Sequence, residues 1–179
     1  GIEAVKNLTH RGAIGGDGKT GDGAGVLIEI PKRFFQDYIE EEGLEISHID
    51  NLCVGVLFLY DDVRGSVEEQ IRKSPFSCVG WREVPVDKSA VGETALKVMP
   101  KIFHLLLDGE RVPEERRELE LYLLRRAIER DKKISQKVYV ASLSSRTMVY
   151  KGMFVAPQLD KFYKDLQDDR IDYSFRLFH

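Results

Sequence analysis

The feature that most constrains the fold is a segment crowded with glycine directly before an apolar run. Between His10 and Gly25 the sequence reads HRGAIGGDGKTGDGAG and holds seven of the chain's fifteen glycines. Glycine serves where φ is positive or where another backbone or a ligand must come close. The segment is therefore either a tightly folded loop or the wall of a binding site, and the apolar run Val26 to Ile30 predicts that it leads into a strand.

Two nucleotide-binding patterns nearly match this segment. Residues 16–21 fit GxGxxG, and residues 18–20 read like the end of a P-loop. Both patterns require a strand before the glycines and a helix after them, so that the helix N-terminus meets the phosphates. Here a helix-like stretch precedes the glycines, a strand follows, and Asp17 and Asp22 would repel a phosphate. The order of elements argues against nucleotide binding.

Composition and charge narrow the class of protein. The chain has 179 residues, 42% hydrophobic and 32% charged, which is typical of one globular domain with its own core, and we expect residues 1–179 to form a single domain. A net charge of -3 gives no general attraction to nucleic acid. No apolar run approaches the roughly 20 residues that cross a bilayer. We expect a cytoplasmic protein that binds neither nucleic acid nor membrane.

Apolar periodicity predicts four helices. Their expected ranges are residues 31–43, 66–73, 113–132 and 159–166, with Ser66 as a cap of the second. In the longest helix we expect the apolar face to be formed by residues repeating at helical spacing, namely Leu119, Tyr122, Leu123, Ala127 and Ile128.

Six apolar runs predict strands at residues 26–30, 52–60, 80–86, 101–107, 137–143 and 147–154. The closing run, IDYSFRLFH, is also strand-like, and because it stops within apolar residues we expect an incomplete chain. Strands and helices do not alternate regularly, and Ser144 and Ser145 separate two strands like a hairpin turn. The predicted fold class is α+β.

The cysteines and histidines do not lie at spacings typical of a catalytic pair or a metal site. Cys53 and Cys78 lie in or beside apolar runs, so we expect small buried residues, not nucleophiles or metal ligands. His104 lies within an apolar run and is expected in the core or at its edge, while His48 is expected in a loop. No metal site is predicted.

The segment LTHRGAIGGDGKTGDGAGVLIEIPKRFF resembles the amino-terminal glutaminase domain of glutamate synthases, a family with HRGA, then TGDGAG, an apolar strand, Pro and a Phe pair. Other stretches resemble the same family in the same order, so the resemblance spans nearly the whole chain. They are VGWREVPVD at 79–87, LYLLRRAIE at 121–129, ASLSSRTMVYKGM at 141–153 and FRLFH at 175–179.

This resemblance implies a class II glutamine amidotransferase with the N-terminal-nucleophile hydrolase fold, an αββα sandwich of two antiparallel sheets between helix layers. In that family an N-terminal cysteine attacks the glutamine amide, and its own amino group, with an ordinary pKa of about 8, serves as the base. The thioester hydrolyses to glutamate. Ammonia passes to a synthase domain or subunit, which uses FMN and an iron-sulfur cluster to aminate 2-oxoglutarate; the glutaminase domain itself carries no cofactor.

The chain departs from the family at its ends. Residue 1 is Gly, not Cys, and the family's first strand, which begins with the nucleophilic cysteine, is missing ahead of it. The family's substrate-binding Arg, oxyanion Asn-Gly pair and substrate-binding Asp come after the FRLFH motif, with which this sequence ends. We therefore expect an incomplete domain without catalytic residues, which releases no ammonia by itself. The alternative is a non-catalytic interaction module of the same fold that binds a synthase partner.

The candidate site residues are His10, Arg11 and Gly12. In the family the Arg-Gly pair lies close to the nucleophile, so the resemblance implies that Arg11 orders its surroundings and that Gly12 allows close backbone approach. The alternative role for Arg11 is to brace the loop through Asp17 or Asp22. Gly21, Gly23 and Gly25 are expected at further points of close approach.

Overall fold

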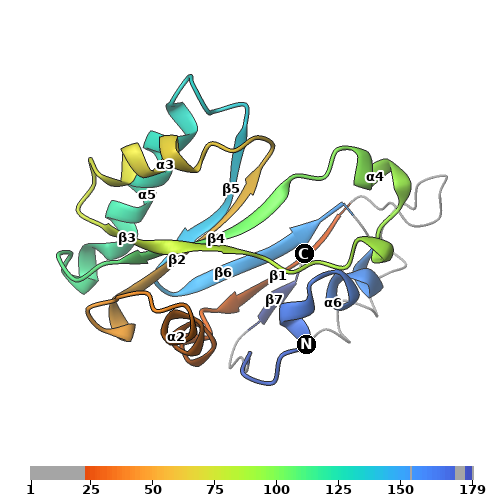
Figure 1. Cartoon of the computed structure of the whole chain (residues 1–179), viewed down its shortest axis with the longest axis horizontal. Helices are drawn as coiled ribbons and strands as arrows, with labels where there is room; N and C mark the ends of the chain where they lie inside the picture. The colour runs from red at the N-terminus through yellow and green to blue at the C-terminus, as the bar shows by residue number, and fades with distance from the viewer. Residues whose placement is uncertain (1–22, 154, 172–175, 179) are drawn as a thin grey trace. The chain divides into compact units, whose positions relative to one another are not determined.

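The structure of the chain is a computed structural model, and it describes residues 23–153, 155–171 and 176–178 (Figure 1). The chain divides into two compact units, and each is described by itself. The described parts of residues 1–29, 84–99 and 149–179 form the first unit, and residues 30–83 and 100–148 form the second. The single domain expected from the sequence stays a prediction.

The second unit is built on a four-stranded antiparallel sheet with the order β3-β4-β2-β5. The central strands, β2 (Leu52–Leu59) and β4 (Lys101–Asp108), are apolar and almost entirely buried. The edge strands are β3 (Ser77–Glu83) and β5 (Val138–Ser144). Long apolar runs in the centre and more mixed ones at the edges are the pattern expected of a sheet covered by other elements.

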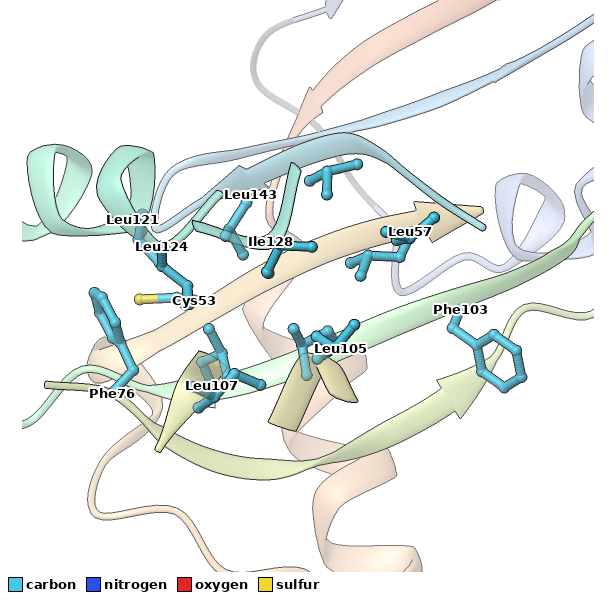
Figure 2. Close-up of a cluster of buried hydrophobic side chains, with 14 of the residues drawn as sticks. Cys53, Leu57, Phe76, Phe103, Leu105, Leu107, Leu121, Leu124, Ile128 and Leu143 are labelled. Atoms are coloured by element: carbon cyan, nitrogen blue, oxygen red, sulfur yellow. The ribbon is translucent and has the colours of Figure 1, made fainter. Parts of the chain in front are cut away.

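Two helices lie side by side on one face of this sheet, namely α3 (Arg64–Ile71) and α5 (Glu114–Arg130) (Figure 1). Figure 2 shows side chains of α5 pointing toward the strands. Leu121, Leu124 and Ile128 of that helix belong to one buried cluster with Cys53 of β2. This cluster is the core of the second unit.

Helix α2 (Lys32–Glu41) contacts the opposite face of the sheet. Phe35 packs edge-to-face on His104 of β4, with ring centroids 5.3 Å apart. Leu105 belongs to the cluster beneath α5. Because neighbouring residues of a strand point to opposite faces, His104 and Leu105 mark the two sides. A 3₁₀ turn, η2 (Ile49–Asn51), then leads into β2.

The first unit holds the three-stranded sheet β6-β1-β7. Its strands are β6 (Thr147–Gly152), β1 (Ala24–Glu29) and β7 (Arg176–Phe178). The first two residues of β6 belong to the second unit. Strands β1 and β7 are antiparallel, with Val26 opposite Phe178. The remaining elements are short: η3 (Lys88–Ala90), α4 (Glu93–Lys97), η4 (Ala156–Gln158), α6 (Leu159–Phe162) and η5 (Lys164–Gln167).

The structure confirms the α+β class and each of the six predicted strands. The hairpin is wrong, because β5 and β6 lie in different sheets. The predicted cap is also wrong: α3 begins at Arg64, before Ser66, and follows Val63 without a side-chain cap. The helix expected at 159–166 is one turn of α6 followed by η5.

Candidate functional site

The candidate site begins where the glycine-rich segment enters β1. His10, Arg11 and Gly12 lie outside the described residues, as do Asp17, Gly21 and Asp22. Gly23 and Gly25 are described. These two glycines show which part of the chain lies next to the end of the glycine-rich segment.

Both glycines face the end of β6. Gly23 has a φ of 132°, and a Cβ atom there would lie 3.6 Å from the Gly152 carbonyl oxygen. A Cβ atom on Gly25 would lie 2.9 Å from the Lys151 Cβ and 3.1 Å from the Tyr150 carbonyl oxygen. Glycine is required at the first position by its backbone angle and at the second by space. The expected close approach is confirmed at Gly25, where the neighbour is strand β6; at Gly23 the backbone angle, not lack of space, requires glycine.

The register brings three chain segments to one edge of the three-stranded sheet. Val26, near the start of β1, lies opposite Phe178, the last residue of β7. Gly23 and Gly25 lie beside residues 150–152, the last part of β6. The start of β1 and the ends of β6 and β7 are therefore neighbours.

Two buried tyrosines hold the end of β6 in place. The Tyr163 hydroxyl donates a 2.6 Å hydrogen bond to the Lys151 carbonyl oxygen, and the Tyr150 hydroxyl donates one of 3.0 Å to Asp165 Oδ2. Their rings meet edge-to-face at 4.7 Å. Both side chains are fully buried, and burial raises the pKa of Tyr163, so it stays a neutral donor. The site edge therefore has rigid support.

Backbone hydrogen bonds fix the segment that carries Tyr163. The Asp87 amide donates to the Phe162 carbonyl oxygen at 2.8 Å, and the Lys164 amide donates to the Pro85 carbonyl oxygen at 3.3 Å. Tyr163 itself forms an antiparallel bridge with Val86. Residues 84–87, the VPVD part of the sequence motif at 79–87, therefore hold Tyr163 in position.

Ser144 and Ser145 bind a carboxylate of α5. Glu118 Oε1 accepts hydrogen bonds from Ser144 Oγ at 3.0 Å, from the Ser145 amide at 2.7 Å and from Ser145 Oγ at 2.8 Å. Ser144 Oγ also accepts from the Arg146 amide at 3.0 Å. These contacts attach the end of β5 to the helix, which is a structural role.

Neither cysteine is prepared for nucleophilic attack. Cys53 is buried, as expected, and burial raises the pKa of its thiol to about 12. Cys78 is exposed, so the expectation of burial is wrong there; it lies on an edge strand. Desolvation and the charge of Glu68 still raise its thiol pKa to about 11. Both thiols are protonated at neutral pH.

The histidines have structural environments. His104 is fully buried, as expected, and burial together with the charge of Arg82 holds its pKa well below the usual value. His48 is exposed in a loop, also as expected, and its Nδ1 accepts a 3.2 Å hydrogen bond from the Asp50 amide at the start of η2. Across the described part of the chain, no group of three or more His, Cys, Asp or Glu side chains could hold a metal ion.

Comparison with known proteins identifies the family. The sequence profile of class-II glutamine amidotransferases matches residues 1–179. The chain belongs to the class II glutamine amidotransferases. This membership agrees with an α+β fold containing two antiparallel sheets.

Individual relatives confirm the resemblance to glutamate synthases. The chain is 40% identical over 189 residues to the glutamate synthase [NADPH] large chain of Azospirillum brasilense, covering 100% of the chain and 12% of that protein. It is 35% identical to ferredoxin-dependent glutamate synthase of Cyanidium caldarium, covering 99% and 12%, and 35% identical to chloroplastic ferredoxin-dependent glutamate synthase 2 of Arabidopsis thaliana, covering 98% and 11%. The chain thus spans about an eighth or less of these relatives.

The sequence reasoning missed the residues that support the site edge. Tyr150, Tyr163 and Asp165 lie in segments predicted only as strand and helix. Asp165 lies in a stretch rich in charged residues, LDKFYKDLQDD at 159–169, so nothing in the local sequence marks it as a buried acceptor. Among the described residues, no helix is long and apolar enough to cross a membrane.

Proposed function

We propose that this chain belongs to the glutaminase domain of a glutamate synthase, which as part of the complete protein hydrolyses glutamine to glutamate and ammonia. The observation that carries the proposal is the sheet edge at which the glycine-rich segment enters β1 beside the ends of β6 and β7. In the family it resembles, the segment before this edge lies close to the nucleophile, and the segment after FRLFH carries the substrate-binding arginine. The register of β1 and β7 supports a meeting of these two segments.

In the reaction that the resemblance implies, the thiol of an N-terminal cysteine attacks the glutamine amide carbon. The amide leaves as ammonia after accepting a proton, and water then hydrolyses the thioester to glutamate and free thiol. This chain's own contribution is positioning. Arg11 orders the surroundings of the nucleophile, and Gly12 lets the backbone come close to it.

The partner of this reaction is a synthase part of the same enzyme. Ammonia passes to it and aminates 2-oxoglutarate there, and the resemblance assigns FMN and an iron-sulfur cluster to that part alone. The cytoplasmic location stays a prediction. So does the expectation that residues 1–179 release no ammonia by themselves.

The test is Arg11→Lys in the full-length protein, with glutamine-dependent and ammonia-dependent glutamate synthesis measured side by side. Lysine keeps the charge but loses the planar fork that bonds two acceptors. Glutamine-dependent turnover should fall by about tenfold or more, equivalent to about 1.4 kcal/mol in the barrier, while ammonia-dependent synthesis is unchanged. Arg33→Lys, an exposed position on α2, is the matched control and should leave both rates unaltered.

Two outcomes count against this assignment. Equal loss of both rates would remove Arg11 from the glutaminase site. A drop in melting temperature with unchanged turnover per folded molecule would favour the bracing role through Asp17 or Asp22. If the unsubstituted full-length protein makes glutamate from ammonia but not from glutamine, the non-catalytic interaction module is the correct function.

A further inference from the structure

Helix α5 has two apolar faces, and only one of them is used by the fold. Leu121, Leu124 and Ile128 are buried in the core of the second unit. Leu119, Tyr122 and Leu123, which the sequence placed on the core face, are 52%, 57% and 51% exposed. Residues three and four apart on a helix are neighbours, so these three side chains form one continuous patch, called here the outer face of α5.

Several charged side chains near this face pair with one another. Arg116 and Glu120 form an ion pair of 3.0 Å. Arg125 and Arg126 both pair with Glu129, at 2.8 and 2.7 Å. These pairs form within the helix, without help from a partner. The chemistry that fits the patch is therefore an apolar surface, since no complementary charge is called for.

The size of the patch separates two kinds of occupant. Three large side chains that are about half exposed present together about 300 Å² of accessible surface. A stable complex of separate proteins buries about 800 Å² on each partner, so the outer face is too small to hold a second copy of this chain by itself. A surface on the same polypeptide needs less area, because the covalent connection supplies a high effective concentration.

We propose that the outer face of α5 docks against an apolar surface elsewhere on the same polypeptide, in its synthase part. This inference rests on the proposed function, and it fits the relatives, in which the matching stretch is 11–12% of a much longer chain. A glutaminase part that passes ammonia onward must be held against the part that receives it. The outer face supplies one such contact through Leu119, Tyr122 and Leu123.

The test is cysteine labelling of the native full-length protein. Leu123→Cys and Lys73→Cys are prepared separately, treated with a maleimide, and read at the substituted peptide by mass spectrometry. Lys73 is an exposed polar position after α3 and serves as the control. Residue 123 should react at least about tenfold more slowly than residue 73 in the native protein, because an interface excludes solvent, and equally fast after denaturation.

Each result decides the matter. Equal native labelling rates at the two positions would overturn the proposal. Protection of residue 123 that is lost on about a hundredfold dilution would also overturn it, because it would identify a second copy as the occupant. Protection that survives dilution supports a surface on the same chain. The readout needs no turnover, so a failure of the proposed glutaminase function appears separately, in the glutamine-dependent rate.

Discussion

His104 makes the stability of this protein depend on pH. Its side chain is fully buried on β4, packs against the Phe35 ring, and lies 3.4 Å from Arg82, measured from Nδ1 to Nη1. A guanidinium can only donate, so Nδ1 accepts, and the imidazole is neutral. Protonation would place two positive charges together in a buried site. Burial first, and the Arg82 charge second, therefore lower the pKa well below its usual value.

The sign and size of the effect follow from that lowered pKa. The unfolded chain takes up the proton near its ordinary pKa of about 6.5, and the folded chain does so only at lower pH. Above about pH 6.5 the neutral His104 side chain contributes its full stabilisation to the folded chain. Below that pH, the free energy of unfolding falls by about 1.4 kcal/mol for each unit of acidification, until the pKa of His104 in the folded chain is reached. Between pH 6.5 and 5.0 the loss is about 2 kcal/mol if the folded pKa lies below that window.

Substitution of His104 with Gln should remove this dependence. Urea unfolding of the 179-residue chain can be followed through Trp81, its single tryptophan, which packs against the core of the same unit. The stability difference between the original chain and His104→Gln should narrow steadily as the pH falls from 7 to 5. His48→Gln, at an exposed position, is the control. Parallel curves for the original chain and His104→Gln would refute the reasoning.

Three further substitutions test the supports described above. Glu118→Ala should destabilise the protein by about 2 kcal/mol in urea unfolding, since it leaves the Ser145 amide and two hydroxyls without their charged acceptor. Gly25→Ala should cost about 1–3 kcal/mol, because its methyl group would lie 2.9 Å from the Lys151 Cβ; unchanged stability would mean that β6 can shift freely. Tyr163→Phe should lower the free energy of unfolding by about 1–2 kcal/mol, because it removes the hydrogen-bond donor to a buried carbonyl. Its melting temperature should therefore fall by less than that of Gly25→Ala.

The strands were predictable because each carries its own signal. Runs such as residues 52–59 and 101–108 are apolar along their length, which only a covered sheet accommodates. The way strands combine into sheets carries no comparable local signal. Ser144 and Ser145 look like a hairpin turn in sequence, yet both hydroxyls donate to Glu118, on a helix more than twenty residues earlier. A contact at that separation is invisible to a pattern read along the chain.

Helix α5 shows why periodicity alone misassigns a face. Its range was predicted closely, but apolar residues occur on two sides of it. Arg117 belongs to the buried side, where it donates to the Asp50 carbonyl oxygen at 3.1 Å and to Asn51 Oδ1 at 2.9 Å, while Leu119 is exposed. A buried arginine is satisfied by partners that only the fold brings near it. A rule that buries apolar residues and exposes charged ones therefore chooses the wrong side.

The candidate site was predictable in part. The glycines marked the entrance to β1, and the space beside Gly25 gives one of them its reason. The roles of His10, Arg11 and Gly12 stay predictions, because these residues lie outside the described part. The support from Tyr163 depends on a hydrogen bond to Lys151, twelve residues earlier and in another element. No spacing rule links a helix end to the carbonyl group of a strand.

The pairing of β1 with β7 has a consequence for the order in which the protein forms. Val26 and Phe178 are about 150 residues apart in sequence, and contacts of such separation form slowly because a long loop must close first. The four strands of the second unit all lie between residues 52 and 144, so on a ribosome they emerge before β7 does. Until then β1 lacks one of its neighbours. The edge that the glycine-rich segment enters therefore gains β7 only after the larger sheet has all its strands.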